Sequence, residues 1–234
     1  QQRLIIEELA AHKLSLLRIK AQRKTQKSSI FSIHENLPSQ LIESLDFKLT
    51  GAQLRCIGEI NQDMSSSQPM LRLLQGDVGS GKTIVAVFIL LQAVENNFQT
   101  AIMAPTEILA QQHLQSFTSY LDHLGIKVAF LSGSQNTEER RTQTNLIASG
   151  KAQVVIGTHA LFQESVSFNN LGLVIIDEQH KFGVHQRLSL AQKAKKVPHQ
   201  LVMTATPIPR SLTMSVYADL DTSVIDELPP GRQK

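Results

Sequence analysis

The sequence predicts an α/β fold in which helices cover both faces of a mostly parallel sheet. Short apolar, β-rich runs alternate along the chain with longer runs of helical length. A glycine-rich segment, GDVGSGKT at 76–83, follows one apolar run and precedes a helix-length one. A carboxylate pair, Asp177 and Glu178, follows another apolar run. Strand–helix alternation of this kind builds parallel sheets.

The expected elements follow this alternation. An N-terminal helix is expected at 3–24, and its basic end could meet phosphates or form a solvated face. Residues 28–46, which include Pro38, are expected to form an irregular connector. Strands are expected at 71–74, 101–104, 128–131, 154–156, 173–176 and 201–204. Helices are expected at 52–62, 83–96, 108–124, 137–148 and 184–193, with a short one after Pro209.

Composition limits the classes of function. The 234 residues, 41% of them hydrophobic, can build one large domain or two small ones. A net charge of +3 allows a nucleic-acid partner without requiring one. The single cysteine, Cys56, excludes an internal disulfide and a cysteine-based zinc site and suits a reducing cytosol. No apolar run approaches the ~18 residues that span a bilayer. We therefore expect a cytoplasmic protein without a membrane partner.

Segment 76–83 fits the phosphate-binding pattern G-x-x-x-x-G-K-[ST]. Glycines let several backbone N–H groups point at one anion, and the following helix adds the positive end of its dipole. Lys82 is expected to reach the β- and γ-phosphates of a nucleotide, and the Thr83 hydroxyl to ligate Mg²⁺. The predicted nucleotide-binding residues of this loop are Gly76, Gly79, Ser80, Gly81, Lys82 and Thr83. The alternative is a glycine-rich turn before a buried helix.

The carboxylate pair follows the strand expected at 173–176. Ligand groups in open α/β sheets lie at the carboxyl ends of strands, so this pair should emerge beside the phosphate loop. Asp177 is expected to hold Mg²⁺, and Glu178 to orient or deprotonate the attacking water. Catalytic roles are therefore predicted for Lys82, Asp177 and Glu178. Asp177 could instead cap a helix.

A third element, Thr204-Ala205-Thr206, ends another apolar run, where its threonines could bond the carboxylate loop or simply end a strand. GDVGSGKT, DEQH at 177–180 and TAT in this order resemble superfamily 2 helicases. The finer spelling, over about residues 47–233, is similar to the RecG family of bacterial branched-DNA helicases. The stretches that carry this likeness are APTEILAQQH (104–113), GTHAL (157–161), DEQHKFGV (177–184), MTATPIPRSL (203–212) and VIDELPPGR (224–232).

The resemblance implies a RecA-like P-loop NTPase lobe that uses ATP and Mg²⁺ and acts on branched or forked duplex DNA. It also implies that Gln53 reads adenine, for which a surface helix residue is the alternative. Contacts with DNA, or coupling of DNA grip to nucleotide state, are implied for Thr106, Gly133, Thr158, Gln179, His180, Thr204 and Thr206. Thr106 and Thr158 could instead be helix N-caps, and His180 a structural histidine.

The resemblance also divides the chain. A linker helix and connector would occupy 1–46, the first RecA-like lobe 47–225, and a linker toward a missing second lobe 226–234. A second RecA-like lobe, which would bring an arginine finger, and an N-terminal wedge domain are expected as partners in the parent chain. The piece alone is then expected to be weakly active or inactive. Two alternatives stay open: an Mfd-like transcription–repair translocase, and a nucleotide-binding module without motor activity.

Overall fold

The computed structural model describes residues 26–177, 193–205 and 220–228. The predicted helices at 3–24 and after Pro209 lie outside these residues, as does all but the last residue of the one at 184–193. The strands are β1 (Leu71–Gly76), β2 (Gln99–Met103), β3 (Val128–Leu131), β4 (Val154–Gly157), β5 (Leu171–Asp177), β6 (His199–Thr204) and β7 (Asp221–Ile225). The helices are α2 (Asn36–Ser44), α3 (Gly51–Met64), α4 (Lys82–Glu95), α5 (Glu107–Leu121) and α6 (Thr137–Ala148), with 3₁₀ turns η1 (Asp122–Leu124) and η2 (His159–Phe162).

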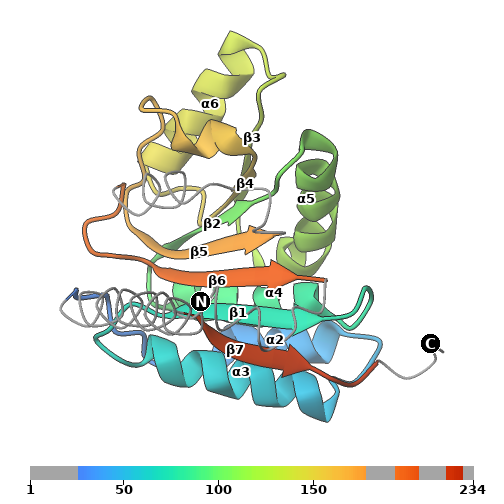
Figure 1. Cartoon of the computed structure of the whole chain (residues 1–234). Coiled ribbons are helices and arrows are strands. Elements are labelled where there is room, and N and C mark those ends of the chain that lie inside the picture. The colour runs from blue at the N-terminus through green and yellow to red at the C-terminus, as the bar shows by residue number, and fades with distance from the viewer. Residues whose placement is uncertain (1–25, 178–192, 206–219, 229–234) are drawn as a thin grey trace, which may run out of the picture.

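The strands form one sheet in the order β3-β4-β2-β5-β6-β1-β7, and every neighbouring pair is parallel (Figure 1). β1 and β2 are consecutive in sequence, yet β5 and β6 lie between them. The carboxyl edge of such a sheet, where the strand order reverses, is the usual place for a ligand. The predicted α/β class is confirmed, and all six expected strands are present.

Helices cover both faces of the sheet. Ile175 of β5 belongs to an apolar cluster with α3, α4 and α5, whereas its neighbour Ile176 belongs to a second cluster with α6 and η2. This alternation follows from the two-residue period of a strand, and strands buried on both faces read as continuous apolar runs. Every residue of α4 from Ile84 to Ala93 is buried, and all of them except Gln92 belong to the first cluster, as expected for a helix that is apolar on nearly every side.

Helix α2 corrects the expectation of an irregular connector at 28–46. Pro38 is the third residue of this helix, a position where a backbone N–H has no intrahelical partner, so proline is tolerated there. Leu41 is fully buried against the first cluster, and the Leu37 N–H donates to Glu95 Oε1 at 3.0 Å. The segment therefore packs on the lobe as ordered structure.

Strand β7 was not predicted. It lies at the edge of the sheet, paired only with β1 among the described strands. Ser223 and Ile225 are buried, whereas the other three residues are exposed. A run with one buried serine and one buried isoleucine lacks the apolar signal that identified the other strands.

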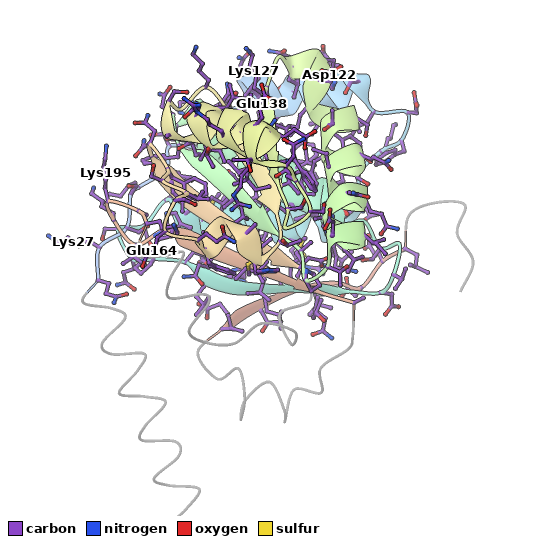
Figure 2. All side chains as sticks on the ribbon, turned by 90° about the horizontal axis from the view of Figure 1, so that it is seen from above. Lys27, Asp122, Lys127, Glu138, Glu164 and Lys195 are labelled. Atoms are coloured by element: carbon purple, nitrogen blue, oxygen red, sulfur yellow. The ribbon has the colours of Figure 1, made fainter. Side chains whose placement is uncertain are left out.

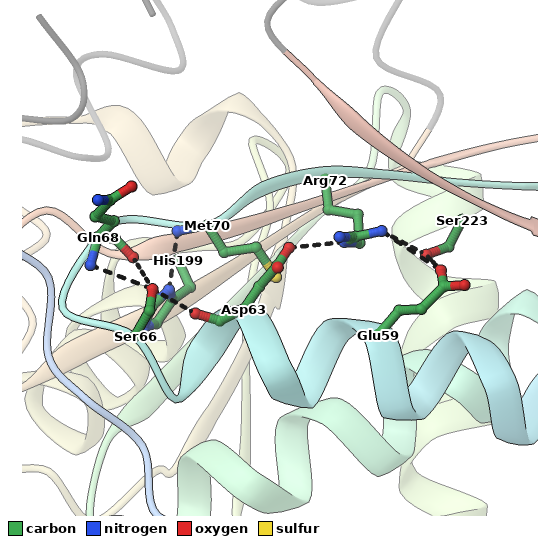
Figure 3. A network of polar contacts seen from close by, with 8 residues as sticks. All are labelled: Glu59, Asp63, Ser66, Gln68, Met70, Arg72, His199 and Ser223. Carbon is green, nitrogen blue, oxygen red and sulfur yellow. Dashed lines mark hydrogen bonds and ion pairs between the residues drawn. The ribbon is translucent and has the colours of Figure 1, made fainter. Parts of the chain in front are cut away.

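The segment before α2 docks on the sheet through His199, a buried residue at the start of β6. His199 Nδ1 accepts the Met70 N–H at 3.0 Å (Figure 3), so Nε2 carries the ring hydrogen and donates to Ser29 O at 2.8 Å. Phe31 stacks on Phe98 with ring centroids 4.9 Å apart and meets the His199 ring edge-on at the same separation. Burial lowers the pKa of His199, which favours its neutral form.

Arg72 of β1 joins α3 to the edge of the sheet (Figure 3). Its Nε donates to Asp63 Oδ2 at 2.8 Å, and its Nη1 donates to Ser223 Oγ at 2.9 Å and to Glu59 Oε2 at 3.4 Å. The Arg72 side chain is only 12% exposed. The contacts therefore fix α3, β1 and β7 relative to one another.

Other charged side chains lie at the periphery. Lys27, Lys127 and Lys195 are exposed and project from the outside of the domain (Figure 2). No helix within the described residues is long and apolar enough to cross a membrane. The polar groups that matter for a ligand are those at the carboxyl edge of the sheet.

Candidate nucleotide-binding site

The segment 76–83 runs from the last residue of β1 through a loop into the first turn of α4, as predicted. Gly79 and Gly81 have φ angles of 83° and 89°, a region that L side chains enter only at a cost of roughly 1–2 kcal/mol. Gly81 is the N-cap of α4, and the Ser80 N–H donates back to Asp77 O at 3.1 Å. The first N–H groups of α4 thus point toward the loop, which is the arrangement that binds phosphate.

Lys82 lies at the first position of α4 and folds over the loop. Its Nζ donates to Gly76 O at 2.7 Å and to Asp77 O at 2.9 Å. The ammonium charge therefore sits within the curve of the loop, beside the N-terminus of α4. A phosphate bound there would meet the lysine charge and the helix dipole together.

Gln53 lies against the back of this loop. Its Oε1 accepts the Thr50 N–H at 2.9 Å in a capping box that begins α3, and its Nε2 donates to Ser80 O at 2.9 Å. Gln53 is 1% exposed, so the alternative of a surface helix residue is wrong. A Cβ atom on Gly81 would overlap Gln53 Nε2, so a side chain there would displace Gln53, and the positive φ of Gly81 would add strain. Because Gln53 is enclosed, reading a base would require its surroundings to move, and that role stays a prediction.

Asp177 ends β5 at the same edge of the sheet. Its register partner on β6 is Met203, and the next residue of β6, Thr204, is the partner of Gln75 on β1. Strand β6 therefore separates β5, which ends at Asp177, from β1, which leads into the phosphate loop. The axes of β5 and β1 are about 10 Å apart. Thr204 is buried. Asp177, Thr204 and the phosphate loop therefore lie at one edge of the sheet, as expected for the carboxyl ends of parallel strands.

His113 contacts Asp177, and the sequence did not single it out. His113 Nε2 and Asp177 Oδ2 are 2.7 Å apart, and each side chain is 14% exposed. His113 belongs to α5, which follows β2, the strand next to β5. The two residues are 64 positions apart, so no local spacing pattern pairs them. The one sequence signal for His113 is its place in the stretch APTEILAQQH, which resembles the helicase family.

A pocket of about 340 Å³ lies beside the phosphate loop, at the carboxyl ends of β6, β1 and β7. Its lining includes Gly76, Ser80, Ala205, Ile225 and Glu227. The tail at 226–228, expected to be a linker, packs here against α3. Glu227 Oε2 accepts the Ala52 N–H at 3.0 Å near the N-terminus of α3.

Asp226 pairs with Arg55 of α3, Oδ1 to Nη2, at 2.7 Å. The pairing lowers the pKa of the Asp226 carboxyl and raises that of the Arg55 guanidinium, through the same hydrogen bond. Arg55 Nη2 also donates to Val224 O at 3.0 Å. Both side chains are largely exposed, so the pair orients the tail more than it stabilises the lobe.

The loops expected to contact DNA surround a polar cluster that centres on Glu107. Thr106 caps α5, where its hydroxyl accepts the Leu109 N–H at 3.3 Å, as the N-cap alternative predicted. Glu107 Oε1 accepts the hydroxyls of Ser132, at 3.0 Å, and of Ser134. These bonds join the loop after β2 to the loop after β3.

Two other predicted contacts differ in exposure. Gly133 is exposed between the two serines, with open space around it. Thr158 is 3% exposed, and no partner for its hydroxyl is found among the described residues. Its φ and ψ place it as the N-cap of η2, although the side chain makes no capping bond. In this conformation a phosphate could reach Gly133 but not the Thr158 hydroxyl.

Four predicted site residues lie outside the described residues. They are Glu178, Gln179, His180 and Thr206. Within the described residues, no group of three or more His, Cys, Asp or Glu side chains is arranged to hold a metal ion.

The structure has the three features of a nucleotide-binding lobe of a P-loop NTPase. They are a parallel sheet with a reversed strand order, a glycine loop that leads to a helix, and an aspartate at the same edge of the sheet. The sequence profile of the DEAD/DEAH box helicases matches residues 50–215. The chain belongs to this DEAD/DEAH box helicase family.

The chain is similar to ATP-dependent DNA helicases named RecG. It is 55% identical over 235 residues to RecG of Escherichia coli K12, and 51% identical over 233 residues to RecG of Aquifex aeolicus. These alignments cover 99% of this chain, which spans 34% and 29% of the length of those relatives. The predicted likeness to RecG is confirmed.

Among solved structures, RecG bound to a three-way DNA junction superposes with a TM-score of 0.88 at 46% identity, over 100% of this chain and 31% of that one. The helicase MrfA superposes with a TM-score of 0.63 at 20% identity, over 85% of this chain and 33% of that one. The second likeness shows the fold alone. The predicted RecA-like lobe is confirmed.

Proposed function

We propose that this chain is the ATP-binding lobe of an ATP-dependent DNA helicase or translocase that remodels branched DNA, such as stalled forks and Holliday junctions, in recombination and repair. The conformation of the loop at 76–83 carries the nucleotide part of this proposal, because Gly79 and Gly81 adopt the positive φ angles that let a loop wrap a phosphate. The DNA part rests on the identity to the RecG relatives and on the relative bound to a three-way junction.

The residues have distinct roles in this proposal. Lys82 and the N–H groups at the start of α4 bind the phosphate chain of ATP. Thr83 and Asp177 would hold Mg²⁺; an aspartate oxygen and a hydroxyl are ligands that this hard cation prefers. When bound, Mg²⁺ neutralises charge that develops on the phosphates. Glu178 would orient the attacking water.

DNA contact is proposed for the loops after β2, β3 and β4. Exposed N–H groups and small side chains suit phosphates, because they donate hydrogen bonds without demanding a base. Gly133 is the described residue that best meets this condition. Thr204 and Thr206, together with Gln179 and His180, would couple the nucleotide state at the Asp177–Glu178 loop to the binding of DNA.

The complete activity would require more than this lobe. In helicases of this kind a second RecA-like lobe closes over the nucleotide, and an arginine from a partner surface can raise the rate by ~10³–10⁵. We therefore propose that the second lobe and a DNA-splitting wedge domain are partners in a cytoplasmic parent protein, and that this lobe alone binds ATP or ADP weakly. The division at 1–46, 47–225 and 226–234 stays part of the proposal.

Nucleotide binding by calorimetry tests the proposal directly. ADP should bind the wild-type chain, and Lys82→Ala should weaken that binding at least ~10-fold through loss of charge-assisted hydrogen bonds. Lys127→Ala, which removes an exposed lysine elsewhere, is the matched control. Equal ADP affinity of Lys82→Ala and wild type would contradict the loop assignment. ATP turnover should be very slow with or without forked DNA. Strong stimulation by DNA would contradict the proposal that this lobe holds only part of the ATPase site.

A further inference from the structure

His113 lies on the face of α5 that packs against the sheet. Ala110 and Phe117 are buried, and His113 falls between them at helical spacing. An apolar residue is the usual occupant of such a position. The imidazole packs edge-on against the Phe117 ring, with centroids 5.9 Å apart and an interplanar angle of 66°. Packing therefore holds the ring in place before any hydrogen bond is considered.

The hydrogen bond from this ring reaches Asp177. An ionised carboxylate can only accept hydrogen bonds, so His113 Nε2, 2.7 Å from Asp177 Oδ2, carries the hydrogen and donates it. Charge-assisted bonds of this length are among the stronger ones in proteins. Among the described residues, no hydrogen bond to Asp177 Oδ1 is found, so the carboxylate is fixed through one oxygen.

We propose that His113 is a positioning residue for the metal-binding carboxylate. By holding Oδ2, His113 would keep the Asp177 carboxylate in the single orientation in which it serves Mg²⁺. The proposal rests on the function proposed above, in which Asp177 serves the metal. The hydrogen-bond partners of metal-ligating groups set the ligand orientation, and their loss typically weakens metal affinity by ~10–100-fold.

The test separates Mg²⁺ from nucleotide. Binding of the non-hydrolysable ATP analogue AMP-PNP to the whole chain is measured by calorimetry, first in excess EDTA and then across a Mg²⁺ titration. His113→Leu removes the donor, and His113→Gln keeps an N–H donor on a side chain of similar reach. His123→Leu is the matched control, because His123 is exposed in η1, the turn that follows α5. Thermal melting checks that each variant is folded.

We expect His113→Leu to raise the Mg²⁺ concentration for half-maximal effect by about 10-fold or more, with affinity in EDTA unchanged. His113→Gln should recover most of the Mg²⁺ response, and His123→Leu should behave as wild type. An unchanged Mg²⁺ titration in His113→Leu would overturn the proposal, as would equal losses in EDTA and in Mg²⁺. If wild type binds in EDTA and Lys82→Ala does not, the nucleotide function stands whatever His113 does. Failure of wild type to bind at all would overturn both.

Discussion

The side-chain amide of Gln53 donates a hydrogen bond to the backbone oxygen of Ser80 at 2.9 Å, which joins the start of α3 to the phosphate loop. The same side chain accepts the Thr50 N–H, so one buried residue both begins a helix and supports a loop. Glu227 reaches the same helix terminus from the tail after β7. The phosphate loop, α3 and the tail are thereby linked by consecutive contacts.

Replacing Gln53 with alanine should destabilise the lobe by about 1–3 kcal/mol, because Ser80 O and the Thr50 N–H lose buried partners. The phosphate loop should also bind nucleotide less tightly, since its support is removed. Urea unfolding and ADP calorimetry measure the two effects. Gln62→Ala on the exposed side of α3 is the control. Unchanged stability and affinity in Gln53→Ala would refute the linkage.

Replacing Glu227 with glutamine keeps an acceptor for the Ala52 N–H but removes the negative charge at the N-terminus of α3. An exposed charge at such a position contributes ~0.3–1 kcal/mol at low ionic strength. We therefore expect a small loss of unfolding free energy that disappears in high salt, where the charge is screened. Glu43→Gln, exposed on α2 away from this contact, should show no such salt dependence. A salt-independent loss would point to packing instead.

Replacing Arg72 with methionine should lower the unfolding free energy by about 2–3 kcal/mol, since the partly buried carboxylates of Glu59 and Asp63 lose charged partners. Arg55→Met is the matched control on α3, because its pair with Asp226 is exposed and should matter little. Chemical denaturation compares the two. If both variants lose the same stability, burial of the Arg72 side chain is not the cause.

His199 should make stability depend on pH. Burial lowers its folded-state pKa below the ordinary value of 6.5, so the unfolded chain binds more protons in the interval between the two values. The stabilisation from neutral His199 is complete above pH 6.5 and is lost as pH falls through the folded pKa. Unfolding free energies measured between pH 7.5 and pH 5, chosen to bracket about 6.5, should fall more steeply for wild type than for His199→Asn. His123→Asn, at an exposed site, should keep the wild-type slope; equal slopes in all three would exclude His199 as the source.

Most of the fold could be predicted because parallel strands buried on both faces are short, continuous apolar runs. The run at 128–131 and the helix at 137–148 have the predicted bounds. Strand β7 escaped because only Ser223 and Ile225 are buried in it. Helix α2 lies in the segment expected to be an irregular connector, and its Pro38 is compatible with a helix because proline fits the first turn.

The candidate site was predictable where one segment encodes it. The loop at 76–83 needs glycine at fixed positions and a helix after it, and the sequence shows both the glycines and an apolar run of helical length. Contacts between distant segments were not visible. His113 reaches Asp177 across 64 positions, and Glu227 reaches Ala52 across 175. No local pattern of spacing encodes such pairs, because the strand order alone brings them together.

The strand order has a consequence for synthesis on the ribosome. Both sheet neighbours of β1 come late in the chain: β6 begins at His199 and β7 at Asp221. The chain emerges N-terminus first, so β2, β3 and β4 can pair while the strand that leads into the phosphate loop still has both edges bare. Unpaired edges invite association with other chains. A nascent chain halted before His199 would therefore be a client for chaperones and would not bind nucleotide.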